Sequence, residues 1–127
     1  MSQREVIATN DAPKNIGPYS QAIRANGFIF VSGQTPIDPS TQQLISGSVG
    51  EQTERVLRNI EAILKQAGSG MAKIVRCGVF LKDMNDFAAM NEAYGKFFPN
   101  DPPARTTIQA ARLPKDCQVE IDAIALE

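Results

Sequence analysis

The side chains best suited to chemistry in this chain are Arg105 and Glu120, which stand close together near its end. Arg105 follows two prolines and an alanine, and prolines stiffen the backbone and favour an extended approach to the arginine. A guanidinium on a stiff segment can hold a carboxylate through two parallel hydrogen bonds. The alternative is a surface ion pair, worth about 0–1 kcal/mol. Spacing alone leaves both open.

Glu120 lies in a segment of alternating apolar and acidic residues. The alternation places Val119 and Ile121 on one face of a strand and Glu120 and Asp122 on the other. A carboxylate on a sheet face that is covered by another subunit loses part of its hydration, which raises its pKa and suits it to proton transfer. The alternative is a wet sheet face that carries two ordinary acids.

Four further residues give weaker signals. Asn91 shares the apolar face of an expected helix with Phe87 and Tyr94, so its amide either ties two elements together or faces a polar pocket. Tyr19 follows a Gly-Pro turn, and Ser32 and Gly33 end a strand, where a glycine lets a ligand approach the backbone closely. Each of these alone is more typical of a loop or a structural contact than of a site.

The composition excludes several kinds of function. The chain has no histidine, which rules out Ser-His-Asp triads, Cys-His pairs and His-based zinc sites. It has no phosphate-binding or dinucleotide-binding glycine motif. Thirteen basic and fourteen acidic residues are well mixed, so the basic stripe of a nucleic-acid binder is missing. Chemistry therefore falls to Arg, Glu, Tyr, Ser, Thr and backbone amides.

With 127 residues the chain is long enough for one domain, taken as residues 1–127. Asn26-Gly27 between two strand-like runs predicts a hairpin. Ser48 and Glu51 predict a capping box, and Gly68 the end of that helix. The elements expected are strands at 5–9, 21–25 and 28–33, a helix at 48–67, a strand at 74–81, a helix at 86–98, and strands at 106–110 and 119–126.

This order predicts an α+β fold, with one mixed sheet and both helices on one face. In the strand 74–81 we expect Ile74 and Phe80 on one face and Val75, Val79 and Leu81 on the other. Two helices cover only one face, so the second apolar face predicts an oligomer. The alternative is an unusually apolar sheet face left in water.

The chain has no apolar run of the roughly 20 residues that span a bilayer, and its start resembles neither a signal nor a transit peptide. We therefore expect a soluble cytoplasmic protein, or a mitochondrial one if a leader was removed. In such a protein Cys77 and Cys117 are expected to be reduced thiols.

Four stretches resemble the reactive intermediate deaminase (Rid) family, RidA subfamily: "IGPYSQAI", "IFVSGQTPIDP", "VFLKDMNDFAAMNEAYGKFF" and "PARTTIQAARLPKDCQVEIDAIA". The likeness covers nearly the whole chain. It implies a chorismate-mutase-like fold and a homotrimer with a site in each cleft between subunits. It also implies hydrolysis of 2-iminopropanoate and 2-iminobutanoate, which pyridoxal-phosphate dehydratases release, to 2-oxo acids and ammonia, without metal or cofactor.

The resemblance also assigns roles residue by residue. Arg105 matches the family arginine that holds the substrate carboxylate, and Glu120 matches the acid that positions or deprotonates water. The matching pocket residues are Tyr19, Ser32, Gly33 and Asn91. Thr107 stands where many members have cysteine and is kept as a substrate contact. Pro102 replaces a frequent aromatic residue, which bears on side-chain preference.

Two alternatives from other classes stay open. One is a non-catalytic trimer that binds small carboxylates or partner proteins in the same clefts, a role that fits members without the arginine. The other is the translation-inhibiting or RNA-cleaving activity ascribed to some relatives, against which the charge balance counts.

Overall fold

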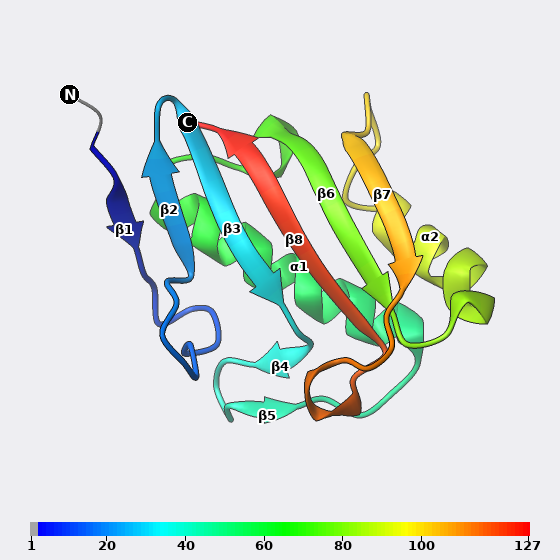
Figure 1. Cartoon of the computed structure of the whole chain (residues 1–127). Coiled ribbons are helices and arrows are strands. Elements are labelled where there is room, and N and C mark those ends of the chain that lie inside the picture. The colour runs from blue at the N-terminus through cyan, green and yellow to red at the C-terminus, as the bar shows by residue number, and fades with distance from the viewer. Residues whose placement is uncertain (1–2) are drawn as a thin grey trace.

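The computed structural model describes residues 3–127 as one six-stranded sheet backed by two helices (Figure 1). The strands of the sheet lie in the order β1-β2-β3-β8-β6-β7, and only β6 and β7 run parallel to each other. Their bounds are Glu5–Ile7 (β1), Ala22–Ala25 (β2), Phe28–Gln34 (β3), Ile74–Leu81 (β6), Ala104–Gln109 (β7) and Val119–Leu126 (β8). The mixed sheet and the α+β class are as predicted.

The remaining elements connect and cover this sheet. They are the helices Val49–Gln66 (α1) and Phe87–Gly95 (α2), the two-residue strands Ile37–Asp38 (β4) and Gln43–Leu44 (β5), and the 3-10 turns Met71–Lys73, Met84–Asp86 and Pro114–Asp116. No helix within residues 3–127 is long and apolar enough to cross a membrane.

Local sequence signals account for the well-predicted boundaries. Asn26 and Gly27 both have positive φ (51° and 83°), as a type I′ turn between β2 and β3 requires. At the start of α1, Ser48 Oγ accepts a hydrogen bond from the Glu51 amide, and the Glu51 carboxylate accepts one from the Ser48 amide. Gly68, with φ +79°, follows the helix in the left-handed conformation that glycine adopts without strain.

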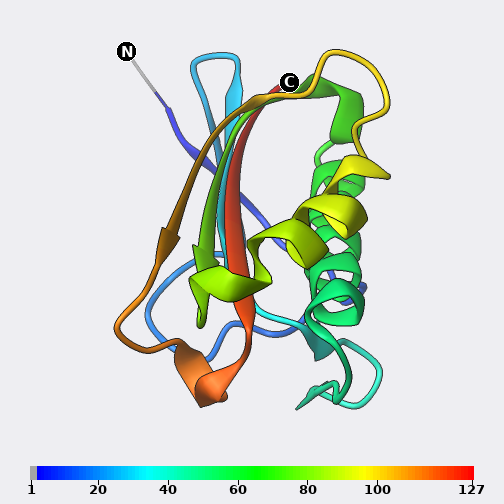
Figure 2. The ribbon, with the colours of Figure 1, turned by 90° about the vertical axis from the view of Figure 1, so that its right-hand side faces the viewer.

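Both helices cover the same face of the sheet, as the edge-on view in Figure 2 shows. The apolar side of α1 packs on the inward residues of β3 and β8, and inward residues of β6 and buried residues of α2 complete the core. We call the opposite side the open face. Large apolar side chains on it are exposed: Val6, Phe28, Phe30, Ile108 and Leu126. The predicted uncovered apolar face is therefore present.

The predicted facing of β6 was wrong at its first residues. A β-bulge between Ile74 and Arg76 adds one residue against β8, so Ile74 joins Val79 and Leu81 on the core side. Val75 is exposed instead of sharing a face with Val79 and Leu81. A prediction that alternates successive side chains between the two faces cannot locate an extra residue inserted into the strand.

The second helix was also predicted too long. α2 ends at Gly95, and the next amides, of Phe97 and Phe98, bond three residues back to Tyr94 and Gly95 in tighter turns. Phe98 is still buried, but Phe87 is 39% exposed and does not belong to the core stripe. The strand expected at 5–9 ends at Ile7, and β7 begins two residues earlier than expected.

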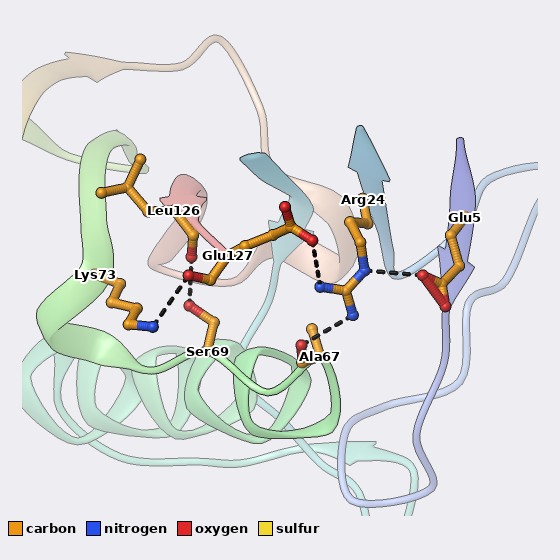
Figure 3. A network of polar contacts seen from close by, with 7 residues as sticks. All are labelled: Glu5, Arg24, Ala67, Ser69, Lys73, Leu126 and Glu127. Atoms are coloured by element: carbon orange, nitrogen blue, oxygen red, sulfur yellow. Dashed lines mark hydrogen bonds and ion pairs between the residues drawn. The ribbon is translucent and has the colours of Figure 1, made fainter. Parts of the chain in front are cut away.

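A polar cluster fixes the end of β8 to the rest of the fold (Figure 3). The Arg24 guanidinium donates to Glu5 (2.8 Å), to Glu127 (3.2 Å) and to the Ala67 carbonyl (2.9 Å). Two further hydrogen bonds run from Ser69 Oγ to the Leu126 carbonyl (2.6 Å) and from Lys73 Nζ to the Glu127 carbonyl (3.0 Å). One arginine thus joins β1, β2, the end of α1 and the last residue.

Candidate functional site

Four of the predicted site residues line one pocket of about 350 Å³. They are Tyr19, Ser32, Gly33 and Glu120. The last three lie at the end of β3 and the start of β8, which meet the lower edge of the sheet in Figure 1. We call this cavity the Glu120 pocket. Its other walls come from the loop 13–16, from Gln21, from residues 34, 35 and 37 at the end of β3 and the start of β4, and from Pro114.

Gly33 is required by the position of the Glu120 carboxylate. Glu120 points across the sheet at the backbone of Gly33, and a Cβ on Gly33 would clash with its Oε2 atom. The backbone of Gly33 is not in the left-handed region, so space rather than conformation demands glycine there. This close approach places the carboxylate directly against the end of β3.

The electrostatics of the pocket suit Glu120 to proton transfer. Partial burial raises the pKa of the Glu120 carboxyl, and the neighbouring Asp122 charge adds to the rise. Glu120 forms no ion pair with any residue in the part of the chain that the structure describes. Its proton affinity is therefore set by desolvation and by a like charge, as is typical of acid–base groups.

Two hydroxyl groups offer opposite hydrogen-bonding roles in this pocket. Ser32 Oγ donates its proton to the Ser20 carbonyl at 2.6 Å, so its lone pairs remain for a donor. Tyr19 Oη accepts from the Ile16 amide at 3.2 Å, so its proton remains for an acceptor. One hydroxyl is thus arranged to accept and the other to donate.

Gln21 supports the wall of the pocket, and the sequence reading missed it. Its side chain is buried, accepts from the Thr9 amide (2.7 Å) and donates to the Pro13 carbonyl (2.8 Å). These bonds hold together the loop 8–21, which carries Tyr19, just before β2 begins. The sequence gives no signal for this role beyond a glutamine two residues after Tyr19.

The predicted carboxylate-binding residue, Arg105, lies elsewhere. It pairs in register with Cys77, a core residue, and so points to the helix side of the sheet. Its guanidinium carbon lies 4.8 Å from the ring centre of Tyr94 and 5.5 Å from that of Phe87, both on α2. Within residues 3–127, Arg105 has no ion-pair partner.

Three buried polar atoms lie on the same two elements as this arginine and its rings. Asn91 Oδ1 on α2 and Thr107 Oγ1 on β7 have no hydrogen-bond partner among the described residues, and Tyr94 Oη on α2 has only the weakly polar thiol of Cys77 beside it. Thr107 follows Arg105 by two residues and shares its face of β7. Buried polar atoms are normally hydrogen-bonded, so this Arg105 cluster is incomplete as it stands.

The seven predicted site residues therefore form two groups. Tyr19, Ser32, Gly33 and Glu120 meet at the Glu120 pocket, whereas Arg105, Asn91 and Thr107 lie between β7 and α2. Pro102 lies in the segment that leads into β7. Within one chain the structure does not bring Arg105 to Glu120.

Both thiols are free, as expected from the sequence, and the structure also buries them. Burial raises the pKa of Cys117 to about 11, and Cys77 lies beneath the Arg105 cluster with a raised pKa from the same cause. Among residues 3–127, no three acidic, histidine or cysteine side chains are grouped so as to hold a metal ion.

Comparison with known proteins gives a consistent result. A family model described as "Endoribonuclease L-PSP" matches residues 9–127. A RutC family protein from Pyrococcus abyssi is 53% identical over 96% of both chains. The Arabidopsis thaliana protein named "Reactive Intermediate Deaminase A, chloroplastic" is 45% identical over 97% of this chain and 66% of its own.

A solved structure supports the fold. The crystal structure of E. coli TdcF with bound serine is 40% identical to this chain and has a TM-score of 0.92. The match covers 97% of this chain and 98% of that one.

Proposed function

This chain belongs to the Rid family, the proteins that the endoribonuclease L-PSP model describes, and on that premise we propose that it hydrolyses small imine and enamine acids. The expected substrates are 2-iminopropanoate and 2-iminobutanoate, and the products are 2-oxo acids and ammonia. The observation that carries this proposal is the pair of complementary sites: an arginine without an acidic partner and a carboxylate with a raised pKa. The plant relative's name supports the same chemistry.

The reaction requires that the two sites meet, and we propose that a second copy of the chain brings them together. β7, which carries Arg105, is an edge strand, and the open face that carries Glu120 is apolar and uncovered. Packing one copy's β7 edge against the next copy's open face would close the cleft. In a ring of three copies each cleft would be formed in this way.

The proposed reaction needs only two catalytic side chains, Arg105 and Glu120. Arg105 holds the substrate carboxylate, and Glu120 takes a proton from a water molecule whose oxygen attacks the carbon of the protonated imine, which gives a neutral amino alcohol. Glu120 then returns this proton to the nitrogen. The carbon–nitrogen bond breaks with its electron pair leaving on ammonia, the hydroxyl proton passes to Glu120 and on to water, and the 2-oxo acid is released.

The other pocket residues support these steps. Ser32 accepts and Tyr19 donates a hydrogen bond, which would orient the water and the polar end of the substrate. Acid–base help of this kind is worth about 10²–10⁴-fold, and orientation adds more. Asn91 and Thr107 would give their unused polar atoms to the substrate held by Arg105. No metal or cofactor takes part in this scheme.

The test couples a threonine or serine dehydratase to this protein and measures how fast free ammonia appears. We expect the native chain to accelerate release and Arg105→Ala to lose the acceleration. Arg105→Lys should also be poor, because an ammonium lacks the planar fork that binds a carboxylate twice. Equal rates with the native chain and Arg105→Ala would refute catalysis by this site.

The native chain and its site variants also distinguish two other functions. A trimer that only binds carboxylates would bind a 2-oxo acid without accelerating release. The family model's name raises RNA cleavage, which is tested by incubating the native chain and Glu120→Ala with labelled single-stranded RNA. We propose no RNA role, because the formal charge is −1. The proposed compartment is the cytoplasm.

A further inference from the structure

The packing around Arg105 is unusual because its immediate neighbours are aromatic. Phe87 and Tyr94 are seven residues apart on α2, about two helical turns, and so present their rings on one side of the helix. Both rings lie within 6 Å of the guanidinium carbon, at 5.5 Å and 4.8 Å. No carboxylate among the described residues lies within 4 Å of the same group.

This arrangement has a chemical consequence. A nearby acid would fix the arginine but would also occupy its paired N–H groups and cancel its charge. An aromatic ring attracts the cation through its face and leaves the N–H groups at the edge of the guanidinium free. Rings can therefore hold the side chain in place without using the part that recognises a carboxylate.

Core packing explains only one of the two rings. Tyr94 is 5% exposed, belongs to the core, and packs against Phe98 in a tilted arrangement with 4.7 Å between ring centres. Phe87, in contrast, is 39% exposed and lies outside the core cluster. Its contact with Arg105 is the one aromatic interaction that the structure gives it within residues 3–127.

We propose that Phe87 and Tyr94 are positioning residues that form an aromatic clamp, holding Arg105 ready for a substrate carboxylate. This inference rests on the proposed function and adds to it: the clamp sets how tightly the acid group is held, while Glu120 sets the rate of the chemical step. Loss of the clamp should therefore affect binding and leave the chemistry at the imine carbon nearly unchanged.

The test compares four variants: Phe87→Leu, Tyr94→Leu, Tyr94→Phe and Phe97→Leu. The last is a matched control, because Phe97 makes a similar contact with Arg58 (4.9 Å) away from the site. For each we measure the Kd of 2-oxobutanoate by calorimetry, KM and kcat in the coupled assay, and the thermal unfolding midpoint. The 2-oxobutanoate probe reads carboxylate binding without any reaction.

Phe87→Leu should raise Kd and KM by about 2–30-fold, the range of a partly desolvated cation–ring contact, with kcat and unfolding midpoint nearly unchanged. Tyr94→Phe keeps the ring and should bind within about twofold of native. Tyr94→Leu should bind weakly and also unfold earlier, because it leaves a core cavity. Phe97→Leu should bind like the native chain.

The outcomes separate the two proposals. If Arg105→Ala binds weakly while Phe87→Leu and Tyr94→Leu bind like the native chain, the clamp is wrong and the proposed function stands. If Tyr94→Phe loses as much affinity as Tyr94→Leu, the hydroxyl group rather than the aromatic ring of Tyr94 supports binding, and the clamp is also wrong. If Arg105→Ala binds 2-oxobutanoate as well as the native chain, both proposals fall.

Discussion

Arg105 and Glu120 face opposite sides of the same six-stranded sheet. Arg105 is in register with core residue Cys77 and packs on the rings of α2, whereas Glu120 is in register with Phe80 and faces away from the helices. A side chain cannot cross the sheet to reach the other. Any reaction that uses both must combine them from different chains.

A mixing experiment tests this directly. Arg105→Ala and Glu120→Ala should each be inactive alone, but refolding them together in equal amounts should restore about a quarter of native activity, the share of clefts in random rings that receive both intact residues. The control is the double variant Arg105→Ala/Glu120→Ala refolded with Arg105→Ala, which should stay inactive. No recovery in the first mixture would rule out a site shared between chains.

The open face should control assembly. Phe30 lies on it, 44% exposed and next to Phe28 with 6.2 Å between ring centres. Phe30→Lys should tolerate folding, since the position is exposed in one chain, but should separate the copies because assembly would bury an unpaired charge at each contact. Sedimentation equilibrium is expected to show single chains, and the coupled assay no activity. Met84→Lys, also exposed but on a turn, should still assemble.

Gly33→Ala should reduce activity without preventing folding. The added methyl group occupies the space of the Glu120 carboxylate and forces it to turn away, while the backbone at Gly33 accepts alanine without strain. We expect kcat to fall by at least about tenfold, since the proton-transfer group is displaced. Gly95→Ala is the matched control, because a Cβ there meets nothing within 4 Å. Similar kcat values for the two variants would contradict the assigned role of Gly33.

The raised pKa of Glu120 predicts that this carboxyl lowers the free energy of unfolding at neutral pH, although the reaction requires it. In the folded chain this carboxyl keeps its proton at a pH where the unfolded chain has lost it, so the free energy of unfolding falls as pH rises from the ordinary carboxyl range to the raised pKa. Glu120→Gln should remove this loss and be more stable than its parent at neutral pH, though inactive.

Urea unfolding at several pH values, in the Phe30→Lys background to keep chains apart, measures this difference. At acidic pH, where Glu120 is protonated in both states, the difference should shrink. A Glu120→Gln variant that is less stable than its parent at neutral pH would show that the fold stabilises the charged carboxylate instead of destabilising it.

Much of the fold could be predicted because its signals are local. Asn26-Gly27 determines a turn, and Ser48 with Glu51 determines a helix start, whatever lies around them. The errors came where tertiary contacts decide. The bulge at Ile74 depends on the register with β8, and the early end of α2 at Gly95 depends on how the following aromatic residues pack.

The residues of the candidate site could be predicted from the sequence, but the residues that position them could not. The motifs located Arg105 and Glu120, and alternation placed Glu120 on an uncovered face. Helical spacing predicts only that Phe87 and Tyr94 share the apolar face of a helix. It does not predict that both rings contact Arg105 on a neighbouring strand. Gln21 was missed for a similar reason, since its hydrogen-bond partners Thr9 and Pro13 are a loop away.

The position of β8 has a consequence for how the protein is made. β8 is the last strand in the sequence, yet it lies between β3 and β6 and joins the two halves of the sheet (Figure 1). On a ribosome, β1 to β3 and the later pair β6 and β7 emerge with no strand to bridge them. The nascent chain therefore exposes two unpaired strand edges until residues 119–126 leave the exit tunnel, and it depends on late, long-range pairing to complete folding.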